Sequence, residues 1–234
     1  MKKFGITHPV LFELILYVAA FLLALIGMLG CSLFYVPSEL VSSIGRILAG
    51  IVLYAVFRYC FRENRIGAGL VLIVPGLLFV VWNLVTNRVI SGLQITDDLL
   101  PVVITALAPA LFEEVIFRGI FLYNLKENGQ SDLAALLISA VIFGLVHLTN
   151  AAGMNLLNVL VQTGYAIVVG LVLGAVYLRS RDLLSVILLH FLIDFSGQMF
   201  VGKTASFTAP LIAVFVIMMI MEAVYALVLV RKKN

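Results

Sequence analysis

Charged side chains are scarce in this sequence. Asp, Glu, Lys and Arg make up 12% of the 234 residues, whereas about 25% is usual in a soluble domain. The basic residues are scattered and the formal net charge is +3, which gives no support for a nucleic-acid-binding protein. Hydrophobic residues account for 63% of the chain and the mean hydropathy is +1.19. Because a water-soluble fold cannot bury so much apolar surface, we expect an integral membrane protein.

Cysteine is equally scarce. Cys31 and Cys60 are the two cysteines, and both follow long apolar runs. Two cysteines in a membrane chain make neither a disulfide framework nor a cysteine-based metal site. We therefore interpret both as small apolar residues.

Long apolar runs dominate what remains. A helix needs about 20 apolar residues to cross the hydrocarbon core, and eight runs approach that length. They lack the alternation of a barrel strand. The connections between them are short, so we predict an all-α, polytopic membrane protein that forms a single integral membrane domain over residues 1–234. The eight predicted helices are 9–30, 40–61, 68–90, 98–124, 132–149, 155–178, 182–201 and 207–230.

The distribution of Lys and Arg in the connections predicts the orientation, because cytoplasmic loops carry an excess of these residues. With the N-terminus inside, only Arg46, Arg88 and Lys203 lie outside. We therefore expect both termini in the cytoplasm and a multi-pass protein of a bacterial cell membrane. The eleven residues then assigned to the cytoplasm are Lys2, Lys3, Arg58, Arg62, Arg65, Lys126, Arg179, Arg181, Arg231, Lys232 and Lys233.

A few polar residues interrupt the apolar runs. A charged side chain near the bilayer centre costs about 2.5–3.5 kcal/mol on insertion scales, so it is a candidate for function by default. The interruptions fall in four of the predicted helices. They are Glu113, Glu114 and Arg118 in the fourth, His147 in the fifth, His190 and Asp194 in the seventh, and Glu222 in the eighth.

Helical spacing divides the first group. Residues four apart share a face, so Glu114 and Arg118 are expected to meet as an ion pair. That pair either belongs to a functional site or only locks the packing. Glu113 lies about 100° around the helix and has no basic partner on its own helix, so packing alone does not explain it.

The same spacing recurs on two other helices. Phe143 shares a face with His147, and His190 shares a face with Asp194. At about 1.5 Å per residue, Glu113, His147 and His190 lie roughly 12–24 Å from the cytoplasmic helix ends. We expect these groups to converge on one polar site, although separate packing roles are the alternative. Glu222 is expected either to line the same cavity or to pair with another helix.

Such a site would suit hydrolysis. A carboxylate without a cationic partner can act as a general base near neutral pH. Two imidazoles and a second carboxylate can either bind a divalent metal with an open position or surround an oxyanion. Both arrangements would activate water and stabilise a tetrahedral intermediate of hydrolysis. The reaction that they suit best is hydrolysis of a peptide bond.

At these residues the sequence resembles the CPBP family of intramembrane proteases. The resemblance rests on Glu113-Glu114-x-x-x-Arg118 with Gly119 after it, on Phe143-x-x-x-His147 and on His190-x-x-x-Asp194. It covers about residues 100–200. The family joins the CAAX prenyl endopeptidases to bacterial abortive-infection and bacteriocin-immunity proteins.

The resemblance implies a catalytic role for each residue. Glu113 would activate the hydrolytic water with help from His147, while Glu114, Arg118 and Phe143 would support the site. His190 and Asp194 would hold the oxyanion or ligate a metal.

One position departs from the eukaryotic family members, which carry asparagine where this chain has Asp194. Asparagine can donate to an oxyanion, whereas an ionised aspartate only accepts. Asp194 must therefore be protonated, orient His190 or bind metal. A zinc ion held by His147, His190 and Asp194, with Glu113 as the base beside it, would make the protein a metalloprotease. A metal-independent glutamate mechanism stays open.

Two other functions are compatible with these residues. A non-catalytic bacteriocin-immunity or membrane scaffold protein could use the same fold. A small proton-coupled transporter could use the same side chains, but its typical inverted repeats are not visible. As an endopeptidase, the protein is expected to act in the lipid bilayer on a peptide or membrane-protein substrate, and not on nucleic acid.

Overall fold

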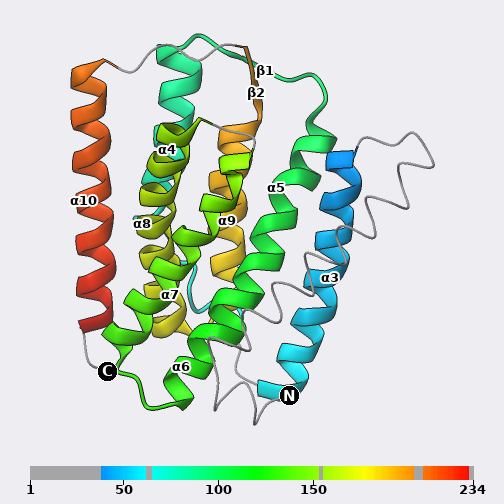
Figure 1. The fold of residues 1–234 in the computed structure, drawn as a ribbon, viewed down its shortest axis with the longest axis vertical. Coiled ribbons are helices and arrows are strands. Elements are labelled where there is room, and N and C mark those ends of the chain that lie inside the picture. The colour runs from blue at the N-terminus through cyan, green and yellow to red at the C-terminus, as the bar shows by residue number, and fades with distance from the viewer. Residues whose placement is uncertain (1–37, 62–64, 153–154, 203–207, 232–234) are drawn as a thin grey trace.

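The computed structural model of the chain describes residues 38–61, 65–152, 155–202 and 208–231. These residues form a bundle of α-helices with a short two-stranded sheet at one end (Figure 1). Strand β1 pairs antiparallel with β2, with Gln94 opposite Val201. The elements are α3 (Ser38–Phe61), α4 (Leu77–Leu84), the π-helix η1 (Val85–Ile90), β1 (Gln94–Ile95), α5 (Leu99–Glu114), the π-helix η2 (Val115–Leu122), α6 (Tyr123–Glu127), α7 (Asp132–Val146), the 3-10 helix η3 (His147–Ala152), α8 (Leu156–Ser180), α9 (Leu183–Gln198), β2 (Phe200–Val201) and α10 (Ala209–Arg231).

The prediction of an all-α polytopic membrane protein is confirmed. Within the described residues, five helical stretches are long and apolar enough to cross a membrane. Two shorter apolar helices, Leu77–Ile90 and Leu183–Gln198, accompany them. The predicted helix 9–30 lies outside the described residues, so the count of eight spans and the cytoplasmic termini stay predictions. The five long stretches are Glu39–Arg58, Leu99–Glu127, Asp132–Ala151, Leu156–Ser180 and Ala209–Arg231.

The predicted third helix, 68–90, is wrong in its first half. Residues 66–76 form successive turns, and the helix begins only at Leu77. Gly67 has a positive φ of 83°, and Pro75 lacks an amide hydrogen. Apolarity predicted a span here, but hydropathy alone does not distinguish a helix from an apolar turn segment.

Tertiary contacts satisfy the backbone of this turn segment. The amide of Gly69 donates to the buried carboxylate of Asp182 at 3.0 Å, and the hydroxyl of Tyr225 donates to the carbonyl of Leu72 at 2.5 Å. A Cβ on Gly69 would lie 2.8 Å from the Cβ of Ser185, so only glycine allows this approach. Non-helical backbone is tolerated at membrane depth where protein groups bind it.

The interface between α7 and α8 is close because small residues lie on both helices. A Cβ on Gly144 of α7 would lie 2.9 Å from the carbonyl oxygen of Thr163. On α8, a Cβ on Gly170 would lie 3.2 Å from the Cα of Ala140, and one on Gly174 would lie 2.7 Å from Leu136. The Gly170-x-x-x-Gly174 pair therefore allows close helix approach.

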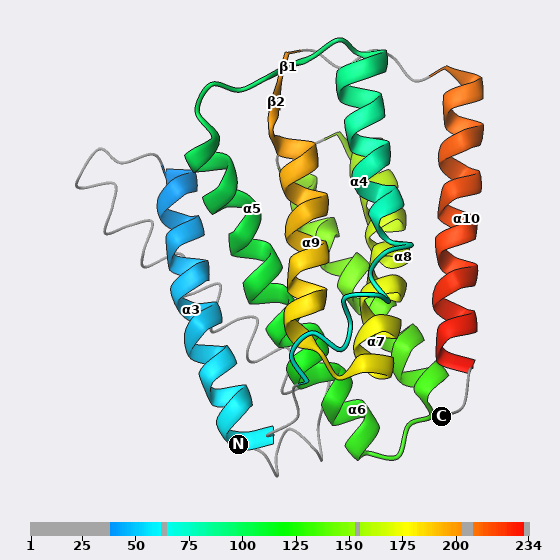
Figure 2. The same ribbon diagram turned by 180° about the vertical axis from the view of Figure 1, so that it is seen from behind.

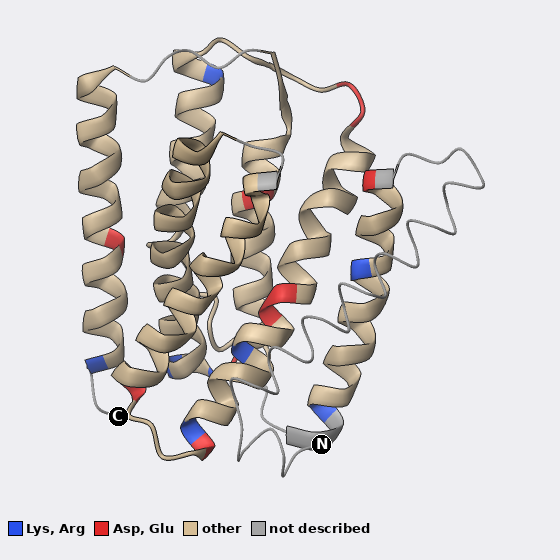
Figure 3. Ribbon diagram, in the orientation of Figure 1, with Lys and Arg blue, Asp and Glu red and all other residues tan. Residues whose placement is uncertain are grey.

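Helix α9 has a central position in the bundle. It packs against α4, α5 and α8, and Figure 2 shows it between α5 and α4. Helix α8 packs against α7 and α10, while α3 packs against α5. The basic residues gather near the end of the bundle that carries α6, whereas acidic positions occur at mid-height on α5 and α10 (Figure 3).

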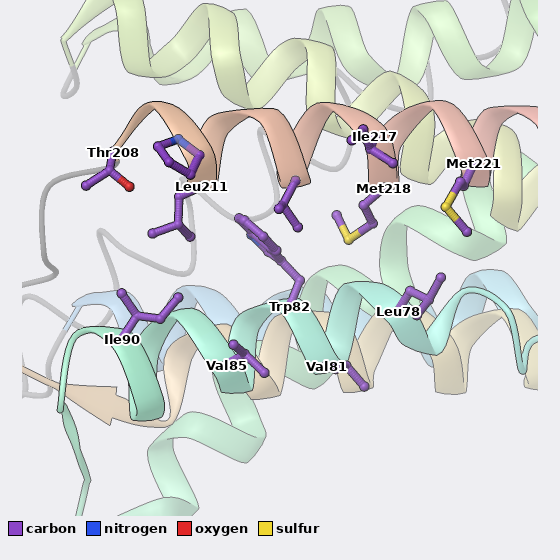
Figure 4. Close-up of a pocket in the computed structure, with 12 residues that line it drawn as sticks. Leu78, Val81, Trp82, Val85, Ile90, Thr208, Leu211, Ile217, Met218 and Met221 are labelled. Carbon is purple, nitrogen blue, oxygen red and sulfur yellow. The ribbon is translucent and has the colours of Figure 1, made fainter.

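An apolar cavity of about 510 Å³ separates α4 and η1 from α10. Trp82, Val85 and Ile90 line one side, and Leu211 and Met218 line the other (Figure 4). None of the residues that line it is ionisable. It therefore offers no acid–base or metal chemistry, and the chemistry must lie among the polar residues elsewhere.

Candidate active site

The candidate active site begins where the longest apolar stretch changes its helical form. Glu113 and Glu114 are the last two residues of α5, and the π-helix η2 follows from Val115 and contains Arg118. Single turns of π-helix often occur at functional positions. His147 follows the last residue of α7 and begins η3, while His190 and Asp194 lie one turn apart on α9. The predicted site residues therefore come from three separate parts of the chain: the junction of α5 and η2, the junction of α7 and η3, and α9.

The predicted pair between Glu114 and Arg118 is formed and is fully buried. Arg118 Nη1 lies 2.6 Å from Glu114 Oε1, and both side chains are 0% exposed. Arg118 Nη2 also donates to the carbonyl of Gly170 at 3.2 Å. This bond ties the helix that carries the glutamates to α8, since a buried guanidinium requires acceptors for its donors.

The second partner of Glu114 could not be predicted from helical spacing. His190 Nδ1 lies 2.8 Å from the same Oε1 atom that binds Arg118. A carboxylate paired with a guanidinium accepts hydrogen bonds, so the proton lies on Nδ1 of His190. Glu114 therefore holds the orientation of the ring and leaves Nε2 directed elsewhere.

His190 Nε2 is directed towards Asp194. The distance to Asp194 Oδ2 is 3.7 Å, which is longer than a hydrogen bond. Asp194 is partly exposed, with 26% of its side chain accessible. His190 and Asp194 therefore face each other across one turn of α9.

Phe143 lies at the centre of this group of residues. Its ring is 4.3 Å from the Arg118 guanidinium carbon, which is a cation–π contact. The ring centroids of His147 and His190 lie 5.4 and 6.0 Å from that of Phe143. The carbonyl of Phe143 lies 3.0 Å from His147 Nδ1. Because a carbonyl only accepts, Nδ1 of His147 carries a proton, and in the neutral ring Nε2 has the lone pair.

Glu113 is half-buried and, among the described residues, forms no ion pair. It therefore differs from Glu114, whose Oε1 is shared by two cationic or potentially cationic groups. The two neighbouring glutamates therefore have different surroundings, and their roles in the site stay predictions.

Two of the nitrogen atoms near the predicted zinc site already have hydrogen-bond partners. In the described part of the chain, no group of three or more His, Cys, Asp or Glu side chains is placed to hold a metal ion. His190 uses Nδ1 for Glu114, and His147 uses Nδ1 for its own helix. The two Nε2 atoms and the Asp194 carboxylate are left as possible ligands, and His190 Nε2 lies 3.7 Å from Asp194 Oδ2. Zinc stays a prediction, and no step of the mechanism below depends on it.

Asn83 of α4 binds helix α9 next to Asp194, and it was not predicted as a site residue from the sequence. Asn83 Nδ2 donates to the carbonyl of Ile193 at 2.9 Å and to the hydroxyl of Ser196 at 3.1 Å. These two bonds lie on either side of Asp194 along the chain. A lone asparagine in an apolar helix was the only available signal, since its partners are 110 and 113 residues away.

Comparison with known protein families identifies this part of the chain. No curated protein and no solved structure gives a significant match. Residues 94–196 match the family described as Type II CAAX prenyl endopeptidase Rce1-like. This range contains all three motifs on which the predicted resemblance rests, and the resemblance is confirmed. Residues 94–196 are therefore a domain of the Rce1-like type II CAAX prenyl endopeptidase family.

Proposed function

We propose that the protein is a glutamate-dependent intramembrane endopeptidase in which Glu113 activates the attacking water. The family of residues 94–196 supports an intramembrane endopeptidase in general. The observation that carries the specific proposal is the contrast between two adjacent glutamates. Glu114 is fully buried and neutralised by Arg118, whereas Glu113 is half-buried and has no ion-pair partner among the described residues.

In this mechanism Glu113 accepts a proton from water while the water oxygen attacks the carbonyl carbon of the peptide bond. The same proton then passes to the leaving amide nitrogen as the carbon–nitrogen bond breaks. His147 assists, because its Nε2 atom can accept a hydrogen bond from the attacking water. A general base of this kind contributes about 10²–10⁴-fold to the rate.

The developing oxyanion is stabilised by the His190–Asp194 pair. Glu114 fixes the His190 ring through Nδ1, which leaves Nε2 and the Asp194 carboxyl 3.7 Å apart. A proton carried by either of these two groups can be donated to the oxyanion, which an ionised aspartate alone cannot do. Such a preorganised donor stabilises the charge that develops in the transition state.

The substrates are peptides or membrane proteins that reach the site within the bilayer, and we place the protein in a bacterial cell membrane. The orientation proposed for it has the basic end, with α6 and the end of α10, in the cytoplasm. The partly exposed side chain of Asp194 provides an approach for a peptide.

The test uses the purified full-length protein in liposomes with a set of prenylated and unmodified peptides, and mass spectrometry detects cleavage. The Glu113→Ala variant is expected to lower kcat by about 10²-fold or more. Glu127→Ala is the matched control, because Glu127 lies exposed at the end of the same helical stretch, and its cleavage rate should equal that of the wild type. Cleavage by Glu113→Ala at the wild-type rate would exclude the mechanism and leave the non-catalytic role.

A further inference from the structure

Asn83 is a polar residue in the otherwise apolar sequence of α4, LLFVVWNL. An amide in such a helix is costly to remove from water unless it is hydrogen-bonded. The side-chain nitrogen of Asn83 carries two hydrogens, and it makes two bonds to α9. One goes to the carbonyl of Ile193 at 2.9 Å and the other to the hydroxyl of Ser196 at 3.1 Å. Both donors of this amide therefore bind the same turn of α9.

The bond to Ile193 acts on the peptide group that leads into Asp194. The carbonyl of Ile193 and the backbone nitrogen of Asp194 belong to one planar unit. The hydroxyl of Ser196 donates to the same carbonyl at 2.9 Å, so Asn83, Ser196 and this carbonyl form a closed ring of three hydrogen bonds. A shift of this peptide group would move the Cα atom of Asp194 and its carboxylate with it.

His190 and Asp194 are held by different neighbouring helices. His190 Nδ1 lies 2.8 Å from the carboxylate of Glu114 on α5, whereas Asn83 of α4 binds the peptide group before Asp194. His190 Nε2 and Asp194 Oδ2 are 3.7 Å apart, which is too far for a hydrogen bond, so their contact does not itself fix the carboxylate. Their separation therefore depends on how α4 and α5 each bind α9.

The position of α4 along α9 is fixed at more than one level. The amide of Gly69 donates at 3.0 Å to the carboxylate of Asp182, the N-cap residue of α9. Nearer the middle of α9, a Cβ on Gly76 would lie 2.7 Å from Leu189 Cδ2. Helix α4 then continues beside α9 (Figure 2). Because these contacts fix α4 along α9, the amide of Asn83 resists a displacement of the peptide group that it binds.

We propose that Asn83 is a positioning residue of the active site, which sets the separation of His190 Nε2 and Asp194 Oδ2 by holding the peptide group before Asp194. The inference rests on the proposed function, in which these two groups stabilise the oxyanion. Without the amide, this turn of α9 can shift and the donor pair no longer meets the developing charge. A misplacement of about 1 Å can cost about 10²-fold in rate. Loss of the amide should therefore affect the chemical step more than substrate affinity.

The first experiment measures kcat and KM for Asn83→Leu in the purified full-length protein, with the liposome peptide assay. Leucine is close to asparagine in size but has no donor. Asn83→Leu should lower kcat roughly tenfold or more, with KM changed less than about twofold. Rates are expressed per folded molecule, at a temperature where the variant is folded. Asn83→Ala removes the same amide without adding apolar bulk, has the same expected result, and is used if Asn83→Leu does not fold.

Thr105→Val is the matched control. The Thr105 hydroxyl on α5 also donates to α9, to the side chain of Gln198 at 2.8 Å, but this bond does not involve the peptide group before Asp194. Its loss should leave kcat within about twofold of wild type. A loss as large as that of Asn83→Leu would mean that any bond to α9 matters equally, which would overturn the inference.

A double-mutant cycle separates positioning from support of the fold. Asn83→Leu is combined with Asp194→Ala, and single-turnover reactions with excess enzyme detect the slow rates. In this background Asn83→Leu should change the rate by less than about twofold, because no carboxylate is left to position. An equal loss with and without Asp194→Ala would overturn the inference, as would equal kcat values for wild type and Asn83→Leu.

Glu113→Ala distinguishes the two proposals. If Glu113→Ala is inactive and Asn83→Leu has the wild-type kcat, only the role of Asn83 fails. If Glu113→Ala is fully active, the proposed function itself fails.

Discussion

Glu113 and Glu114 are adjacent in the sequence, but their surroundings give them different chemistry. Glu114 is 0% exposed and its Oε1 atom binds both Arg118 and His190. Glu113 is half-buried and, among the described residues, has no cationic partner within ion-pair distance. A carboxylate that neutralises an arginine is a poor proton acceptor, whereas one without such a partner can accept a proton from water. Substitutions at the two positions should therefore have different effects on stability and on the cleavage rate.

Removal of the Arg118 side chain should act mainly on stability. It should lower the free energy of unfolding more than it raises the barrier of any single catalytic step. Arg118→Ala would leave the Glu114 carboxylate buried without its cation, which typically costs 3–5 kcal/mol. The free energy of unfolding in detergent measures this loss. The matched control is Lys126→Ala, because Lys126 pairs at 2.5 Å with the exposed Asp132, and such surface pairs contribute about 0–1 kcal/mol. Equal losses in the two variants would contradict a buried structural pair.

Substitution of Asp194 tests whether this residue binds a metal ion or stabilises the oxyanion. Because residue 194 helps to donate a proton to the oxyanion in the proposed mechanism, we expect Asp194→Asn to retain much of the cleavage activity, as asparagine can donate to the oxyanion. No step of the proposed mechanism uses a metal ion, so a strong chelator should leave wild-type activity unchanged. Loss of activity with the chelator, together with one metal ion per chain by elemental analysis, would support the predicted zinc instead. Joint loss of bound metal and activity in Asp194→Asn would instead identify a metal ligand.

At the scale of elements, hydropathy and helical spacing were sufficient where a helix is long and uninterrupted. The predicted ranges 40–61, 98–124, 155–178 and 207–230 agree with α3, α5 to α6, α8 and α10 within a few residues. The turn segment 66–76 was not predictable, because its turns depend on contacts with Asp182 and Tyr225, more than 100 residues away. The change to π-helix after Glu114 likewise has no marker in the hydrophobic pattern.

The contact between α7 and α8 should be sensitive to a single methyl group. A Cβ on Gly144 would lie 2.3 Å from Ile167 Cγ1 and 2.9 Å from the backbone oxygen of Thr163. Gly144→Ala should therefore lower the free energy of unfolding by about 1–3 kcal/mol. Because Arg118 binds the carbonyl of Gly170 on α8, the same variant should also lower the cleavage rate.

Gly164 provides the control for this helix pair. It also lies on α8, but nothing lies within 4 Å of the Cβ that alanine would add. Gly164→Ala should leave stability unchanged or raise it slightly, since alanine favours helix over glycine by up to about 1 kcal/mol. A similar loss of unfolding free energy in Gly144→Ala and Gly164→Ala would mean that Gly144 is required for a reason other than the close approach of α7 and α8.

At the scale of the whole molecule, the sequence predicted which residues form the site but not how they are connected. Low overall charge made each ionisable residue within a predicted span conspicuous, and spacing by four predicted the Glu114–Arg118 pair. The bond from Glu114 to His190 spans 76 residues, and no periodicity within one helix predicts a contact between two. The bonds from Asn83 to Ile193 and Ser196 likewise depend on how α4 and α9 pack together.

The central claim is that the bundle places Glu113 where it activates water for peptide hydrolysis within the membrane. The most direct measurement compares the N-terminal fragments released by cells that carry wild-type protein with those from cells that carry Glu113→Ala at equal protein levels. We predict a defined set of fragments, cut in or beside membrane segments, that is present with the wild type and absent with the variant. Identical fragment sets at equal abundance would contradict the claim.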